Sequence, residues 1–232
     1  MINAYYNTGD FTLYKGDSLE LLNHIDTKVD MIFADPPYFL STGNGKVNIN
    51  GQYIKFDKGQ WDRVRTRNEV DVFNFKWIAS CCKILKESGT IWICGTYHNI
   101  FSVEKCLDQL GFKIINLIVW QKTDPPMTLS DKRLNFCAEY IIWATRKCCK
   151  EYTFNKETLK KINGGTLMQD VWKLPAAGVW EKKCGMCFSI PAYLQVDWQL
   201  ESWRLYWRNE EKCCFCQRQN GRRACGCTCR YQ

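Results

Sequence analysis

The chain has 232 residues, of which 46% are apolar, so it can bury one sizeable core, alone or with an appendage. No apolar run approaches the ~20 residues that span a bilayer, and the first residues lack the basic-then-apolar layout of a signal peptide, so we expect a cytoplasmic protein outside the membrane. With 32 Lys and Arg against 24 Asp and Glu, the net charge of +8 suits an anionic partner such as nucleic acid, although solvated lysines explain it equally well.

Strands and helices are predicted to alternate from the start of the chain. A short strand at 11–14 precedes a helix over 18–25, which Asp17 or Ser18 would cap. Residues 29–34 then form a continuous apolar run, typical of a strand that is covered on both faces of a parallel sheet.

The middle of the chain continues this alternation after a polar, glycine-bearing stretch at 43–68, which predicts a long mobile loop. Helical spacing of apolar residues follows over 69–88 and 102–110, with Gly89 and Gly111 as the expected helix stops. Further strands are predicted at residues 90–95, 113–123 and 138–147. Strands that alternate with helices imply βαβ units, so we predict an α/β fold with a mostly parallel, doubly wound sheet.

The fifteen cysteines are unevenly distributed, with eight in the last 49 residues, and we divide the chain into 1–185 and an atypical tail at 186–232. Seven lie among apolar neighbours before residue 184 and are predicted to be small core residues. The composition changes near Gly185, after which Cys, Trp and Arg are abundant and apolar periodicity is poor. Because nothing marks the chain for export, we expect these thiols to be reduced.

The candidate site follows the apolar run directly as Asp35, Pro36, Pro37 and Tyr38, at the strand end where ligands bind in open α/β sheets. This order suits an exocyclic nucleobase amine, whose lone pair is delocalised into the ring. The Asp35 carboxylate and the Pro36 carbonyl would accept its two N–H groups and favour a localised lone pair, while the prolines stiffen the turn. Tyr38 would stack on a base rotated out of its duplex. The alternative is an ordinary turn, since Asp and Pro both favour turns.

These residues, with "GDSLELL" at 16–22 before them and residues 77–101 and 111–123 after them, resemble the β-class adenine-N6 DNA methyltransferases of bacterial restriction–modification systems. The resemblance covers roughly residues 10–185. It implies a Rossmann-like S-adenosylmethionine-dependent methyltransferase fold, S-adenosylmethionine as methyl donor, no metal in the chemistry, and double-stranded DNA as substrate. Asp35 favours adenine because cytosine-N4 relatives more often carry Ser there; cytosine-N4 transfer stays open.

The resemblance also implies roles for residues outside the turn. Asp35, Asp17 and His98 would lie near the cofactor, although Asp17 is equally explained as a helix cap and His98 as a structural residue. Target recognition would fall within about 124–170. Expected DNA contacts are Lys132, Arg133, Lys46 and Arg65, with Arg146 and Lys147 as further candidates. The family implies a bacterial, nucleoid-associated location; a homodimer and a cognate restriction endonuclease are the partners it leaves open.

The sequence departs from the family after Gly185, where the expected "HPTQKP"-like segment and the glycine-rich "DPFxGxG"-like turn are missing. Three explanations compete: an out-of-frame translation, a divergent domain, or a zinc site made by Cys184, Cys187, Cys213 and Cys216. Out-of-frame translation predicts a sheet that is incomplete at its C-terminal end, with no strand covering 29–34, and weak or absent methyl transfer. The alternative function is an inactive nucleic-acid-binding remnant.

Overall fold

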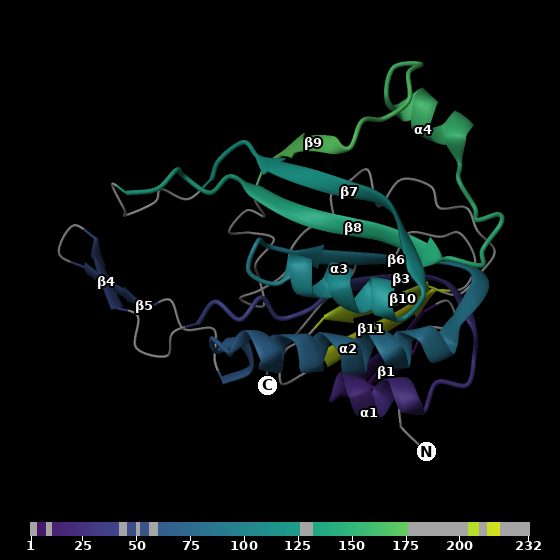
Figure 1. Ribbon diagram of the computed structural model, residues 1–232, viewed down its shortest axis with the longest axis horizontal. Coiled ribbons are helices and arrows are strands. Elements are labelled where there is room, and N and C mark those ends of the chain that lie inside the picture. The colour runs from purple at the N-terminus through teal and green to yellow at the C-terminus, as the bar shows by residue number, and fades with distance from the viewer. Residues whose placement is uncertain are drawn as a thin grey trace.

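The computed structural model describes residues 4–7, 11–41, 46–49, 52–55, 60–125, 132–175, 204–208 and 213–218. These residues form a nine-stranded sheet in the order β1-β2-β11-β10-β3-β6-β8-β7-β9 and a separate β4-β5 hairpin (Figure 1). The strands of the large sheet are β1 (Tyr6–Asn7), β2 (Phe11–Gly16), β3 (Val29–Asp35), β6 (Leu85–Gly95), β7 (Phe112–Lys122), β8 (Ala138–Arg146), β9 (Val171–Leu174), β10 (Arg204–Arg208) and β11 (Cys213–Arg218).

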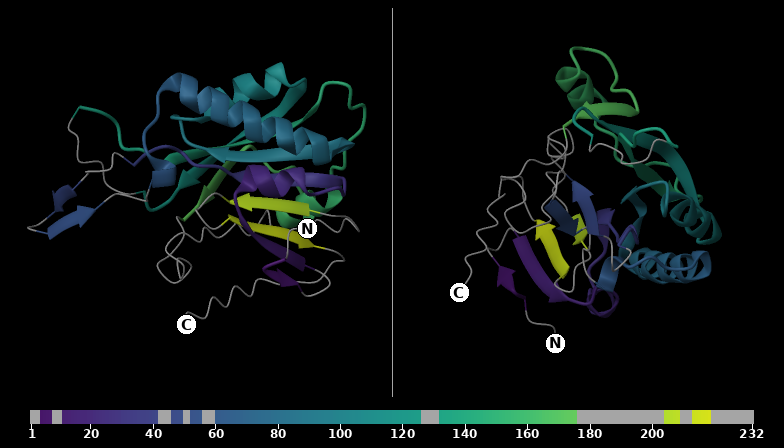
Figure 2. Two further views of the ribbon diagram at one scale, coloured as in Figure 1. Left: turned by 90° about the horizontal axis from the view of Figure 1, so that it is seen from below. Right: turned by 90° about the vertical axis from the view of Figure 1, so that its left-hand side faces the viewer.

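Four helices accompany the strands: α1 (Ser18–Asn23), α2 (Arg67–Ile84), α3 (Ile100–Gln109) and α4 (Lys156–Ile162). Figure 2 shows α2 and α3 side by side along one face of the sheet. In the described part of the chain, no helix is long and apolar enough to cross a membrane.

The α/β class is confirmed, but the prediction of a mostly parallel sheet is wrong. Only the pairs β10–β3, β3–β6 and β7–β9 are parallel, and the other five pairs are antiparallel. The reason lies in the connections. A helix joins β3 to β6 and brings the chain back parallel, whereas β8 follows β7 and β11 follows β10 with no helix between them in the part of the chain that the structure describes, so those pairs run antiparallel.

The strand directions place several chain segments at one edge of the sheet, here called the Asp35 edge. The carboxyl ends of β2, β3, β6 and β7 reach this edge, and β8 begins there, since Gln121 pairs with Ala138 and Gly95 with Tyr140. Parallel neighbours end on the same side of a sheet, so the turn at Asp35 lies next to the loop that follows Gly95.

One face of the sheet packs against α1, α2 and α3 through aliphatic side chains. Ile32 and Ile91 from the strands, Ile78 from α2 and Val103 from α3 are all fully buried in this cluster. Helix α2 begins in a capping box in which Thr66 and Glu69 satisfy each other's backbone N–H. The buried apolar stripe therefore holds the βαβ unit that carries Asp35.

The opposite face of the sheet carries an aromatic cluster. Trp92 and Trp143 stack with ring centroids 4.7 Å apart and an interplanar angle of 18°. Met31, Phe33, Ile118 and Ile141 complete the buried group. Burial on both faces explains why residues 29–34 show a continuous apolar run rather than an alternating one.

Several predicted boundaries need correction. Gly89 does not stop α2, which ends at Ile84; it lies inside β6, where an added Cβ would come within 2.6 Å of the Leu85 side chain. The expected loop at 43–68 contains the β4 (Lys46–Ile49) and β5 (Gln52–Lys55) hairpin. Gly111 does follow α3, with a positive φ of 79°.

The region after Gly185 contributes strands to the sheet. Residues Arg204–Arg208 pair parallel with β3, and Cys213–Arg218 pair antiparallel with β2. The expectation that residues 29–34 lack a strand neighbour on this side is therefore wrong, because β10 supplies the hydrogen-bonding partner that an open edge would lack. Among the seven cysteines expected in the core, Cys148 is exposed, while Cys81, Cys106 and Cys149 are buried.

Candidate active site

The predicted turn lies at the end of β3, with Tyr38 folded inward against Asp35. The Tyr38 hydroxyl donates a hydrogen bond of 2.8 Å to Asp35 Oδ1, and only 8% of the Tyr38 residue is exposed. Burial, and then the Asp35 carboxylate, raise the pKa of Tyr38 well above its ordinary value, so the hydroxyl remains a neutral donor. To stack on a base, the ring would have to turn away from Asp35.

A second carboxylate belongs to the same polar environment. Glu139, near the start of β8, forms an ion pair with Lys122 at the end of β7, and both side chains are partly buried. After burial and Asp35, Glu139 further raises the pKa of the Cys94 thiol at the end of β6, which stays protonated. Four neighbouring strands thus deliver Asp35, Cys94, Lys122 and Glu139 to the Asp35 edge.

The residue after the turn has an unusual backbone. Phe39 adopts φ 56°, a left-handed conformation that costs a bulky residue roughly 1–2 kcal/mol. Its ring packs edge-to-face on Phe73 of α2 at 5.4 Å, and the Arg65 guanidinium carbon lies 4.8 Å from the Phe39 ring centroid. These contacts offset the strain and hold the chain where it leaves Asp35. Arg65, a predicted DNA contact, is exposed where it contacts these two rings.

Asn99, at the end of the loop after β6, supports the turn through its buried side chain. It is fully buried, its Oδ1 accepts a hydrogen bond of 2.9 Å from the Thr96 backbone N–H, and its Nδ2 points at the Pro37 carbonyl oxygen at 3.5 Å. An added Cβ on Gly95 would lie 2.7 Å from Asn99 Oδ1, so this close approach requires glycine. Asn99 therefore ties the loop after β6 to the proline turn after β3.

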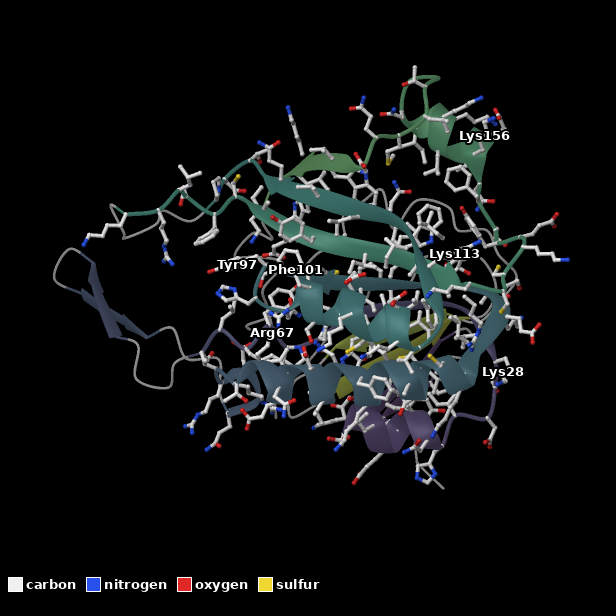
Figure 3. All side chains as sticks on the ribbon, viewed as in Figure 1. Lys28, Arg67, Tyr97, Phe101, Lys113 and Lys156 are labelled. Atoms are coloured by element: carbon white, nitrogen blue, oxygen red, sulfur yellow. The ribbon has the colours of Figure 1, made fainter. Side chains whose placement is uncertain are left out.

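His98 and Arg133 come together on the surface of the same edge. The His98 ring centroid lies 3.8 Å from that of Tyr97. Partial burial, and then the positive charge of Arg133, lower the pKa of His98 below its ordinary value of 6.5. Figure 3 shows Tyr97 at the start of α3, on the outside of the molecule. A predicted cofactor residue and a predicted DNA residue therefore lie close to each other.

Asp17 caps α1, which was one of its two sequence interpretations; the other was a residue near the cofactor. Its Oδ1 accepts hydrogen bonds from Leu19 N at 2.8 Å and Glu20 N at 3.3 Å. With Lys15, Gly16 and Glu20 it lines an open hollow of about 460 Å³. Two carboxylates in a hollow suit the hydroxyl and amino groups of a nucleoside cofactor. Asp17 lies on the Asp35 edge, three strand positions from Asp35, or roughly 14 Å.

The remaining predicted DNA contacts have different positions. Arg146 is unsuited to that role, because its guanidinium donates to the Cys82 carbonyl oxygen at 2.6 Å and to that of Leu85 at 3.3 Å, at the end of α2. Lys147 pairs with Asp108 at 2.6 Å. Lys132 is exposed in the segment before β8. Lys46 is in β4, where only the backbone is described.

The predicted zinc ligands fall almost wholly outside the description. Cys184 and Cys187 lie outside the described residues, and Cys213 and Cys216 belong to β11, of which only the backbone is described. The described residues contain no cluster of His, Cys, Asp and Glu that could hold a metal ion. The zinc site stays a prediction.

Sequence patterns missed the residues that surround the turn. Glu139 and Lys122 lie within predicted strands, and only strand pairing brings them to the Asp35 edge. Asn99 is buried and holds Pro37. The one sequence signal for it was the glycine four residues earlier, which here marks the place where Asn99 packs against the strand end.

Comparison with known proteins gives a consistent result. A family model described as DNA methylase matches residues 29–211, a range that continues beyond Gly185. The type II methyltransferase M2.MboI of Moraxella bovis is 42% identical over 189 residues, covering 79% of this chain and 68% of the relative. M2.DpnII of Streptococcus pneumoniae is 43% identical over 174 residues, covering 74% and 65%. The chain thus spans about two thirds of the length of these relatives.

The fold agrees with a solved structure as well. The PvuII DNA methyltransferase, described as cytosine-N4-specific, superposes with a TM-score of 0.57 over 79% of this chain and 65% of the other. The two sequences are only 16% identical, so this likeness concerns the architecture alone.

Proposed function

Because the chain belongs to the DNA methylase family, we propose that it transfers a methyl group from S-adenosylmethionine to the N6 amino group of adenine in a short duplex DNA site. The observation that carries the proposal is the Asp35-Pro36-Pro37-Tyr38 turn at the carboxyl end of a buried parallel strand. The cofactor supplies an electrophilic methyl group on a sulfonium sulfur.

The turn would act on the amine through its hydrogen-bond acceptors. The Asp35 carboxylate and the Pro36 carbonyl accept one N–H each, which withdraws the nitrogen lone pair from the ring and directs it outward. The Tyr38 hydroxyl occupies Asp35 Oδ1 in this structure, so the proposal includes an exchange in which the amine N–H takes the place of the hydroxyl. Asn99, on the Pro37 carbonyl, keeps the acceptors in place during that exchange.

Asp17 and Glu20 are the residues that we assign to the polar groups of the cofactor, since they line the hollow at the same edge. Adenine, rather than cytosine, is proposed from Asp35 at the first position of the turn and from the similarity to M2.MboI and M2.DpnII. A homodimer and a cognate restriction endonuclease stay predictions.

A second function is a candidate because the sequence after Gly185 lacks the glycine-rich "FxGxG" segment that the family resemblance implies. That function is binding of DNA without methyl transfer. Such a protein would keep the exposed basic residues of the Asp35 edge and lose the cofactor.

Incubation with tritiated S-adenosylmethionine and bacterial DNA that lacks methylation tests the two functions. Incorporation of label, followed by nucleoside mass spectrometry that finds N6-methyladenine, supports the proposal. N4-methylcytosine as the product would replace the adenine assignment. DNA binding without incorporation, together with no heat of cofactor binding in calorimetric titration, would establish the second function.

A further inference from the structure

Two aromatic rings stack on each other at the surface of the Asp35 edge. Tyr97 and Phe136 have ring centroids 5.0 Å apart and an interplanar angle of 14°. Tyr97 is 40% exposed and Phe136 is 45% exposed. The rings come from separate segments, the loop after β6 and the stretch before β8, so the pair exists only because the fold brings these segments together. Figure 3 shows Tyr97 on the outer surface, with Phe101 nearby on α3.

A guanidinium group, an exposed lysine and an imidazole ring accompany the two aromatic rings. The Arg133 guanidinium carbon lies 5.0 Å from the Phe136 ring centroid, within the range of a cation–π contact. The His98 ring is next to Tyr97, and its lowered pKa keeps the imidazole neutral near pH 7. Lys132 is exposed beside Arg133. Stacked aromatic rings edged by positive charge are complementary to a nucleobase and its phosphate, and less so to an apolar protein surface.

The rings also have a fixed relation to the candidate active site. Tyr97 lies between Thr96 and Asn99, which are joined by a hydrogen bond of 2.9 Å, and Asn99 points at the Pro37 carbonyl. One short loop therefore supports the Asp35 turn with its buried end and presents Tyr97 with its exposed middle. A base that is rotated out of a duplex leaves its former partner unpaired, at a cost in stacking energy.

We propose that Tyr97, Phe136 and Arg133 form a platform on which an unpaired base of the DNA substrate stacks, beside the site of methyl transfer. The platform rests on the proposed function for its substrate, since DNA is the ligand it would take. It adds Tyr97 and Phe136, which neither the turn nor the predicted basic contacts include, and gives the predicted contact Arg133 a place beside them. Stacking on an aromatic ring does not depend on base identity, so the platform can be tested without knowledge of the target site.

The test compares a fluorescein-labelled 20-nucleotide single strand of mixed sequence with the same sequence as a fully paired duplex. Fluorescence anisotropy is measured for the full chain and for the double variant Tyr97→Ala/Phe136→Ala. We expect the double variant to bind the single strand about 10- to 100-fold more weakly and the duplex less than about 3-fold more weakly. The variant Tyr97→Phe/Phe136→Tyr keeps two rings and should bind as the unchanged chain does.

Phe154→Ala is the matched control, because Phe154 is 44% exposed but follows the far end of β8, away from the Asp35 edge. It should leave single-strand binding unchanged. If the double variant fails to fold, the single variants Tyr97→Ala and Phe136→Ala take its place, each with a smaller expected loss.

Equal single-strand affinity of the unchanged chain and the alanine variants would overturn the platform and leave methyl transfer untouched. Equal losses for single strand and duplex would also overturn it, because they would show that the rings contribute to DNA binding without an unpaired base. Binding that depends on the rings in a chain that transfers no methyl group would support the platform and refute the proposed function. A chain that binds neither form of DNA would refute both.

Discussion

Two connections leave neighbouring parallel strands at the same edge of the sheet and have opposite characters. The turn at residues 35–39 after β3 is buried, with Tyr38 bonded to Asp35 and Phe39 packed on Phe73. The loop at residues 96–99 after β6 is anchored by a buried asparagine and exposes Tyr97 and His98. In the proposed function, the first arrangement fixes hydrogen-bond acceptors for methyl transfer, and the second leaves an exposed surface for DNA.

The difference teaches how one edge can serve both purposes. Acceptors that act on a weak nucleophile must be held without rearrangement, and this favours burial and several contacts per residue. A loop that contacts DNA must stay exposed, so contacts at its two ends have to fix its conformation. Asn99 belongs to both, because it closes the loop through Thr96 and supports the turn through Pro37.

Asp35→Ala should have the largest effect of the variants. It should lower the rate of methyl transfer, which depends on the turn, and leave the exposed loop unchanged. Losing the carboxylate removes an acceptor that favours the reactive amine, so methyl transfer should fall at least about 100-fold. Single-strand and duplex affinities should change by less than about 3-fold, since the exposed loop is untouched. Labelled-methyl incorporation and anisotropy measure the two quantities. Transfer at the unchanged rate would remove Asp35 from the chemistry.

Asn99→Ala should disturb both connections. It leaves the Thr96 N–H and the Pro37 carbonyl without their buried partner, at a cost of about 1–3 kcal/mol, or about 2–12 °C in melting temperature. Asn99→Asp is the sharper variant, because its carboxylate still accepts from Thr96 but cannot donate to Pro37.

The two Asn99 variants together separate the loop from the turn. We expect Asn99→Asp to lower kcat with a smaller change in KM, since it misplaces acceptors rather than removing a binding surface. Both variants should melt earlier by calorimetry. A variant Asn99→Asp with normal kcat would show that the contact with Pro37 has no part in positioning the turn.

Gly95→Ala should destabilise the junction between the two connections. The new Cβ would lie 2.7 Å from Asn99 Oδ1 and 3.0 Å from Ile100 Cδ1, which costs about 1–3 kcal/mol when the neighbours cannot move away. Gly16→Ala is the control, since its Cβ would meet only the Leu21 side chain at 3.7 Å. Chemical denaturation should show a lower free energy of unfolding for the first variant and little change for the second.

Arg133→Gln should have the smallest effect, which is a change in the pKa of His98 in the exposed loop. Burial and then Arg133 lower the pKa of His98, so removing the charge should raise that pKa part of the way to 6.5. The folded state binds the His98 proton less readily than the unfolded state does, so protonation favours unfolding as pH falls below 6.5. The free energy of unfolding should therefore fall with pH in the unchanged chain, and it should fall less in the Arg133→Gln variant. NMR titration of the two histidines measures the shift; a fall in the pKa would contradict it.

Local sequence patterns predicted most elements of the sheet and the position of the turn. The apolar run at 29–34 arises from burial on both faces of the sheet, which a local pattern records. Gly89 was misassigned because a glycine after a helical pattern has the same local appearance whether it ends a helix or lies in the next strand. The direction of β7 against β8 was not predictable either, since it depends on where a long connection returns.

The residues around the candidate site also divide into those that the local sequence predicted and those that it did not. Asp35, Pro36, Pro37 and Tyr38 are contiguous, so their order along the chain already describes their chemistry, and the family resemblance that begins with them is confirmed by the matched DNA methylase model. The roles of Tyr38 in base stacking, and of Asp17 and His98 at the cofactor, stay predictions. Arg146 shows the limit of charge as a signal, because its guanidinium caps the end of α2.

By itself, the sequence determined the α/β class, the turn after the first buried strand and the membership of the DNA methylase family, because each depends on neighbouring residues in the chain. Only the tertiary structure brought Glu139 and Lys122 together at the Asp35 edge and placed Asn99 against Pro37. It also stacked Tyr97 on Phe136 and paired residues 204–208 with β3. These contacts join segments that are far apart in the chain, and their geometry follows from strand order and packing, which no local pattern encodes.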